Sequence, residues 1–99
     1  MSYVTTQPET LADAAGSLAG IGAVVKADNA AAAAPITGVM PPAGDQVSLL
    51  TAAQFIAHAN LYQAVSAQAA AVHEMLVNTL HASSSSYAAT EAANAAAAR

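Results

Sequence analysis

The sequence has no cysteine and very little positive charge. Without thiols the chain has no disulfide and no thiolate metal ligand, although this says nothing firm about its compartment. The only basic side chains are Lys26 and Arg99, against six acidic residues, and the formal net charge is -4. Two cations so far apart form no basic patch, which excludes binding through the phosphates of a nucleic acid.

Long uninterrupted apolar runs are also absent. The longest contain Lys26 and Asp28, or two glutamines and His73, so we expect no membrane span. No Lys or Arg precedes the first apolar stretch, which Pro8 and Glu9 interrupt, so we expect no N-terminal secretory signal. If the protein leaves the cell, its export signal must lie elsewhere in the chain.

Side chains that could carry out chemistry are few. His58, His73 and His81 are the only imidazoles, and none has a second metal ligand three or four residues further on. The serines lack the glycine-flanked setting of a nucleophile elbow. We therefore expect no catalytic, cofactor-binding or metal site, and no enzyme activity. His58 is expected to pack near the seam between two helices, and His81 to lie at a helix C-terminus.

Alanine dominates what is present. The chain is 56% hydrophobic, but roughly a third of its residues are alanine. Burying one methyl group contributes only on the order of 0.8 kcal/mol, so the composition overstates the core that the chain can build. We therefore expect a monomer of marginal stability.

A first helix is predicted over about residues 7–34. Thr6 and Glu9 have the spacing of a capping box, in which each side chain bonds the backbone N–H of the other residue. Pro8 suits the first turn, where its missing N–H costs nothing. Pro35 is expected to end the helix.

The first helix also shows a seven-residue repeat. Leu11, Leu18 and Val25 recur at the spacing typical of a seam between near-parallel helices. Gly16 and Gly20 lie on another face, where glycine costs about 1 kcal/mol relative to alanine. We expect a second helix to approach closely at these two glycines.

A Pro- and Gly-rich connection follows and is short enough to make the two helices antiparallel neighbours. Ile36, Val39 and Met40 lie in this connection and have two readings: they cap the end of the hairpin, or they form a tip that contacts a partner. Asp45 is a predicted N-cap for a second helix over about residues 45–81.

The second helix has a wide apolar face. At roughly 100° per residue the large apolar side chains fall within an arc of roughly 140°, wider than the stripe of about 100° that covers one core: Val47, Leu50, Phe55, Leu61, Tyr62, Val65, Val72, Met75, Leu76 and Leu80. The opposite side is polar: Asn60, Gln63, Glu74, Asn78 and His81. Gln54 and Gln68 fall inside the arc and are expected to hydrogen-bond across an interface. We therefore expect part of this core to belong to another protein.

After His81 the character of the sequence changes. A run of four serines is followed by Tyr87, Glu91 and an alanine-rich end. Because serine weakens helices, residues 83–99 are predicted to be a flexible C-terminal tail, separate from a helical hairpin domain over residues 1–82.

Several of these features together resemble the PE family of mycobacteria. They are the Pro8-Glu9 pair, the alanine-rich helical hairpin, and the spacing Tyr87-x-x-x-Glu91 after the second helix. The similarity extends over nearly the whole chain and includes the segments 18–22 and 50–55. The chain resembles the short stand-alone type, without the long extension that many family members carry.

The resemblance implies an all-α fold in which an antiparallel two-helix hairpin completes a four-helix bundle with the helices of a PPE partner. The residues expected to bind that partner are Leu11, Leu18, Ile21, Val25, Phe55, Leu61, Tyr62, Val65, Val72 and Leu76.

The resemblance further implies export of the folded pair by a type VII secretion system, after assembly in the cytoplasm. Tyr87 and Glu91 match the family's export signal, which lies at the C-terminal end. A cytosolic chaperone is expected to bind the PPE subunit. The protein would then be secreted or lie at the cell surface.

Two alternatives remain open. The chain and its PPE partner could be an envelope or outer-membrane-associated transport component. Alternatively, two copies of the chain could cover the same apolar arc symmetrically, as a self-associating helical bundle.

Overall fold

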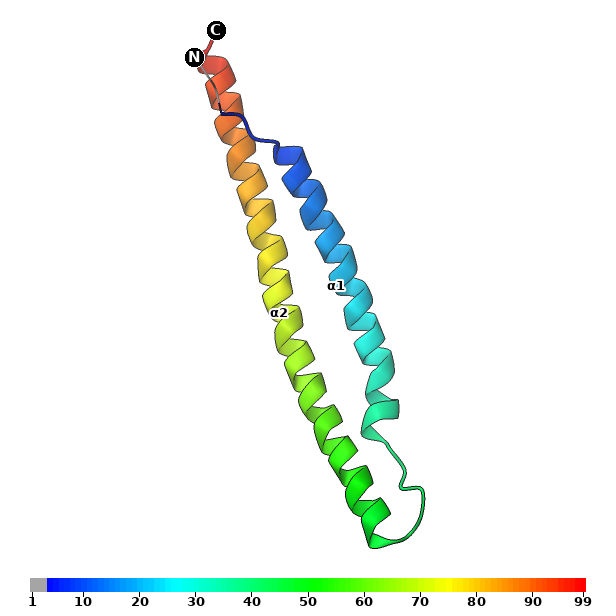
Figure 1. The fold of residues 1–99 in the computed structure, drawn as a ribbon. Helices are drawn as coiled ribbons and strands as arrows, with labels where there is room; N and C mark the ends of the chain where they lie inside the picture. The colour runs from blue at the N-terminus through cyan, green and yellow to red at the C-terminus, as the bar shows by residue number, and fades with distance from the viewer. Residues whose placement is uncertain (1–3) are drawn as a thin grey trace. The chain divides into compact units, whose positions relative to one another are not determined.

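The computed structural model describes residues 4–99, which form two long helices (Figure 1). Helix α1 spans Pro8–Thr37 and helix α2 spans Gln46–Ala97. No strand occurs within residues 4–99. The predicted all-α class is confirmed, and each of the two predicted helices corresponds to one of these elements.

Each helix contributes a segment to two compact units. The terminal unit contains residues 4–22 and 73–99, and the central unit is Ala23–Val72. In the terminal unit, the backbone N–H of Thr6 forms a hydrogen bond with the Glu91 carboxylate, and the His73 ring forms one with the carbonyl of Leu18. In the central unit, Asn29 bonds Tyr62. Within each unit the segments of α1 and α2 therefore run antiparallel, which is consistent with a helical hairpin.

Helix α1 begins one residue later than a capping box at Thr6 requires. The carbonyl of Gln7 accepts hydrogen bonds from the N–H groups of Thr10 at 3.1 Å and Leu11 at 3.3 Å, so Gln7 is the cap. Pro8 occupies the first helical position, as predicted. Thr6 instead donates both its backbone N–H and its hydroxyl to the carboxylate of Glu91 on α2.

Pro35 does not end α1, which continues to Thr37. A proline removes one N–H and crowds the carbonyl four residues earlier, but in the last turn little helix remains to be disrupted. The Thr37 hydroxyl donates to the carbonyl of Ala33 at 2.6 Å, and the N–H of Gly38 donates to Ala34 at 3.0 Å. The bond from Gly38 satisfies a carbonyl that would otherwise lack a partner at the helix end, and the Thr37 hydroxyl adds a second bond in the last turn.

Asp45 caps α2, as predicted. Its Oδ1 accepts the backbone N–H of Ser48 at 2.9 Å, and its Oδ2 accepts the Ser48 hydroxyl at 2.8 Å. The backbone N–H of Ser48, and after it the hydroxyl, lower the pKa of the Asp45 carboxyl from its ordinary value because both bonds favour the charged form.

The predicted end of the second helix near residue 81 is wrong, since α2 continues through the serine run to Ala97. The hydroxyl of Ser84 donates to the carbonyl of Pro8 at 2.7 Å, so this serine bonds across to another segment of the terminal unit. The alanines that follow have the highest helix propensity of any residue. Residues 83–97 are therefore helical, while the division into a hairpin domain and a separate tail stays a prediction.

Small side chains form the seam between the helix segments of each unit. Among residues 4–99 the buried residues are Ala15, Ala52, Ala59, Val77 and Ser84, and no large side chain of this range is fully buried. On α2 the buried and half-buried positions recur at heptad spacing, which is typical of near-parallel packing: Ala52, Ile56, Ala59, Gln63, Ser66 and Ala70 in the central unit, and His73, Val77, Leu80 and Ser84 in the terminal unit. Gln63, predicted on the far side, therefore lies in the seam.

The close approach between helices occurs at Gly22 and not at Gly16 or Gly20. A Cβ at either Gly16 or Gly20 would meet nothing within 4 Å in the part of the chain that the structure describes. A Cβ on Gly22 would lie 2.7 Å from Cδ2 of the His73 ring. The seven-residue spacing from Ala15 places Gly22 in the seam, where the imidazole takes the space of a side chain.

We expect Gly22→Ala to lower the free energy of unfolding by about 1–3 kcal/mol, since it overpacks the contact with His73. Gly20→Ala is the matched control and should be neutral or stabilising by up to about 1 kcal/mol. Thermal unfolding followed by circular dichroism, under conditions that give a cooperative transition, measures both. His73→Ala should restore stability to the Gly22→Ala variant. Equal melting temperatures for the two glycine variants would contradict this packing.

Candidate protein-interaction surface

Large apolar side chains of the central unit lie mostly on its surface. Leu61 is 67% exposed and Val65 is 62% exposed, although both are large apolar side chains. Other exposed large side chains of this unit are Val24, Val25, Met40, Val47, Leu49, Leu50, Phe55, Tyr62 and Val72. The central unit therefore buries alanine and exposes leucine and valine.

The terminal unit shows the same inversion on a smaller scale. Ile21, Met75, Leu76 and Tyr87 are exposed, whereas Ala15, Val77 and Ser84 are buried.

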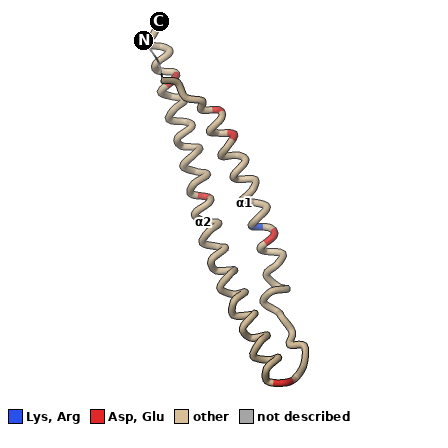
Figure 2. The backbone as a smooth tube through the Cα atoms, viewed as in Figure 1, with Lys and Arg blue, Asp and Glu red and all other residues tan. Residues whose placement is uncertain are grey.

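Helical periodicity explains why the exposed apolar residues gather in stripes. Val47, Leu61 and Met75 recur every fourteen residues, and Val65 and Val72 are seven apart, at heptad positions that differ from those of the seam. Charge does not interrupt these stripes, because Glu74 and Glu91 are the only Asp, Glu, Lys or Arg residues of α2 (Figure 2). Exposed apolar side chains that gather in stripes are typical of protein-interaction sites.

The structure places the predicted partner-binding residues in two environments. Ile21, Val25, Phe55, Leu61, Tyr62, Val65, Val72 and Leu76 are all exposed. Leu11 and Leu18 are half-buried in the terminal unit, where they alternate with Ala15 and Gly22 at heptad spacing. Gln54 and Gln68 are exposed, so hydrogen bonds from them across an interface stay a prediction.

The two residues of the predicted export signal lie one turn apart on α2. Tyr87 is 46% exposed, and Glu91 is half-buried. Glu91 Oε1 accepts the Thr6 backbone N–H at 2.9 Å and the Thr6 hydroxyl at 3.0 Å. The seven-residue spacing from Val77 through Ser84 to Glu91 places the carboxylate in the seam. The contact could have been predicted from this spacing.

Polar contacts across the seam were not predicted from the sequence. In the central unit the Tyr62 hydroxyl donates to Asn29 Oδ1 at 2.7 Å, and Gln63 Nε2 donates to the Asn29 carbonyl at 3.2 Å. In the terminal unit His73 Nε2 lies 2.6 Å from the carbonyl oxygen of Leu18. Each of these side chains is linked to the other helix, so they fix the register of α1 against α2 within their own unit.

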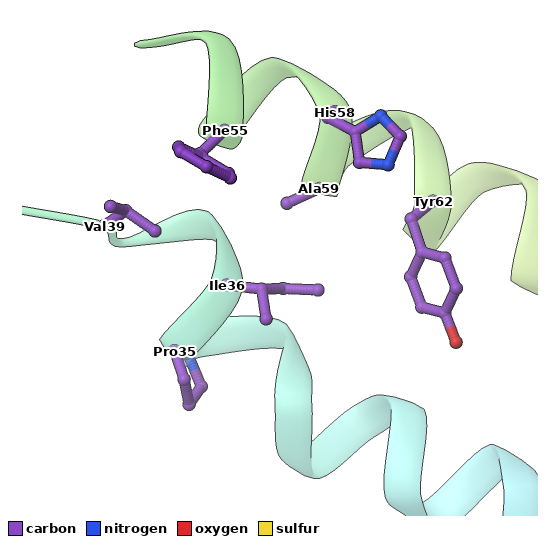
Figure 3. A pocket seen from close by; sticks show the side chains of 7 residues that line it. All are labelled: Pro35, Ile36, Val39, Phe55, His58, Ala59 and Tyr62. Carbon is purple, nitrogen blue, oxygen red and sulfur yellow. The ribbon is translucent and has the colours of Figure 1, made fainter. Parts of the chain in front are cut away.

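An apolar recess of about 300 Å³ lies at the loop end of the central unit. Its lining residues are Pro35, Ile36, Val39, Phe55, His58, Ala59 and Tyr62, and Figure 3 shows the α2 side chains facing Ile36 and Val39. Ile36 and Val39 are half-buried here, in agreement with a capping role, whereas Met40 is 82% exposed and available to a partner.

Two expectations for histidines are wrong. His58 is exposed at the recess instead of packed in the seam. His81 lies inside α2 because the helix continues to Ala97. Across residues 4–99, no three His, Asp or Glu side chains gather into a group that could hold a metal ion.

None of the helices described in residues 4–99 combines the length and the apolar character needed to cross a membrane.

Comparison with known proteins gives consistent matches. The model of the PE family matches residues 4–94. The chain is 65% identical over 98 residues to PE family protein PE13 of Mycobacterium tuberculosis (strain ATCC 25618 / H37Rv), and the match covers 99% of each chain. It is 52% identical over 98 residues to PE family protein PE8 of the same strain, covering 99% of this chain and 36% of that protein.

A longer relative matches at one part only. The chain is 55% identical over 96 residues to PE-PGRS family protein PE_PGRS33 of Mycobacterium tuberculosis (strain CDC 1551 / Oshkosh), covering 97% of this chain and 20% of that protein. Because the family model spans residues 4–94 and a relative aligns along its full length, the chain belongs to the PE family.

Proposed function

We propose that this chain is an interaction protein without catalytic activity, which forms an obligate heterodimer with a PPE protein. The observation that carries the proposal is the inverted distribution of side chains. Alanine and serine occupy the seam of each unit, while Phe55, Leu61 and Val65 are exposed. A chain that folds for itself buries its largest apolar side chains.

The pair forms a four-helix bundle in which helices of the PPE protein cover the exposed stripes of α2 and the exposed apolar side chains of α1. Each large side chain that becomes covered contributes on the order of 1 kcal/mol or more, before the cost of association is subtracted. The absence of charge along the stripes supports an apolar interface, since unpaired charges in such a contact are costly. The expected contact residues include Ile21, Val25, Phe55, Val72 and Leu76, which are all exposed.

The folded pair is exported by a type VII secretion system after assembly in the cytoplasm, and it ends outside the cell or at the cell surface. Tyr87 and Glu91 form the export signal, and a cytosolic chaperone binds the PPE subunit. This part of the proposal rests on the family and on the exposure of Tyr87, which leaves its ring accessible to a receptor.

Co-expression with PPE proteins of the same bacterium tests the pairing. We expect the chain alone to give aggregates or a broad, non-cooperative melt, because its seam buries few large side chains. With the matching PPE protein it should elute as one species whose native mass corresponds to a 1:1 complex. A monodisperse monomer with a cooperative melt would contradict the proposal. A stable homodimer would favour the self-associating bundle instead.

A further inference from the structure

Two attachment points connect the start of α1 to the last turns of α2 in the terminal unit. Thr6 donates its backbone N–H and its hydroxyl to the same oxygen of Glu91, at 2.9 and 3.0 Å. The hydroxyl of Ser84 donates to the carbonyl of Pro8 at 2.7 Å. Ser84 and Glu91 are seven residues apart, so the attachment spans two turns of α2, or about 10 Å.

Tyr87 lies between these two points and is exposed. The serines around it have low helix propensity, and few apolar side chains are buried beyond Ser84. A hydrogen bond to a carboxylate is roughly twice as strong as one between neutral groups. Thr6 therefore provides the strongest polar contact that holds this part of α2 against another segment.

We infer that Thr6 is a positioning residue of the export signal. By holding Glu91, it keeps residues 84–91 helical and presents Tyr87 outward in the form that the secretion machinery recognises. The inference rests on the proposed function, in which Tyr87 and Glu91 are that signal. Thr6 and Glu91, which are 85 positions apart, then belong to one recognition element. In it Glu91 acts by binding Thr6 of its own chain.

Substitutions at Thr6 that leave two, one or no hydrogen-bond donors test this inference. Thr6→Ser keeps both donors, Thr6→Val keeps the N–H alone, and Thr6→Pro keeps neither. In bacteria that co-express the PPE partner, we expect normal secretion for serine, reduced secretion for valine and none for proline. Thr5→Val and Thr5→Pro are matched controls at an exposed neighbouring threonine and should be secreted normally.

Amide hydrogen exchange in the purified heterodimer measures positioning directly. We expect exchange in residues 87–97 to rise about fivefold for Thr6→Val, in line with the loss of one hydrogen bond, and further for Thr6→Pro. Thr6→Ser, which keeps both donors, should show the exchange protection and the secretion of the unmodified chain. Co-purification with the PPE partner should be unchanged for the serine and valine variants, which separates positioning from a failure to fold.

The outcomes distinguish this inference from the proposed function. Normal secretion of Thr6→Val and Thr6→Pro, with Tyr87→Ala blocked, overturns the role of Thr6 and leaves the export signal in place. Loss of secretion for Thr6→Val without any change in exchange also overturns it, since Thr6 would then be read directly. Normal secretion of Tyr87→Ala overturns the assignment of the signal itself.

Discussion

Replacing Leu61 or Val65 with aspartate is expected to abolish co-purification with the PPE partner. Both side chains are more than 60% exposed in the free chain, at 67% and 62%, so neither change disturbs the seam. In the heterodimer the new carboxylate would lie in an apolar contact without a cation to pair with, which costs several kcal/mol. Because each 1.4 kcal/mol is a factor of ten in affinity, we expect binding to weaken by roughly a hundredfold or more.

Asn60→Asp is the matched control for these variants. It adds the same charge within one turn of Leu61, at an exposed position on the polar side of α2. Pull-down of the tagged PPE protein, with titration by calorimetry where the yield allows, measures the three variants side by side. Retention of the partner by both Leu61→Asp and Val65→Asp would show that this stripe faces solvent or another protein.

Tyr87→Ala and Glu91→Ala are each expected to block secretion while leaving the heterodimer intact. Tyr87 is exposed and lies outside the proposed partner-binding stripes, so its loss removes a recognition group and not a packing contact. Loss of the Glu91 carboxylate releases both hydrogen bonds from Thr6. Immunoblots of culture filtrate and cell lysate, with co-purification from the lysate, measure the two effects separately.

Glu74→Ala and Asn94→Ala are the controls for the export variants, since both remove an exposed polar side chain from the same helix. Both should be secreted like the unmodified chain. Secretion of Tyr87→Ala and Glu91→Ala at the control level would place the export signal elsewhere in the pair.

The elements that depend on local sequence could be predicted. Asp45 caps α2 because its side chain reaches the N–H of Ser48 within one turn, an arrangement that needs no knowledge of the rest of the fold. Pro8 begins α1 for the same kind of local reason. The unusual amount of apolar surface on the second helix was also evident from helical periodicity alone.

The contacts between sequence-distant segments could not be predicted by hydrophobicity, because the seam selects side chains by size and hydrogen bonding. Gln63 and His73 lie in it since each reaches a carbonyl of α1. Leu50, Leu61 and Leu76 have greater apolar area but are exposed. The continuation of α2 beyond His81 also depends on a hydrogen bond between sequence-distant segments. The bond from Ser84 to Pro8 ties a residue of low helix propensity to a partner that only the folded chain brings near.

The small side chains of the seam also bear on how well the chain resists proteolysis in the cell. They are alanine, serine and glycine. Contacts between such small groups contribute little per residue, so a chain without its partner is poorly protected from proteases. In the proposed heterodimer, we therefore expect copies synthesised in excess of the partner to be degraded first, so that the level of this chain follows the level of the PPE subunit.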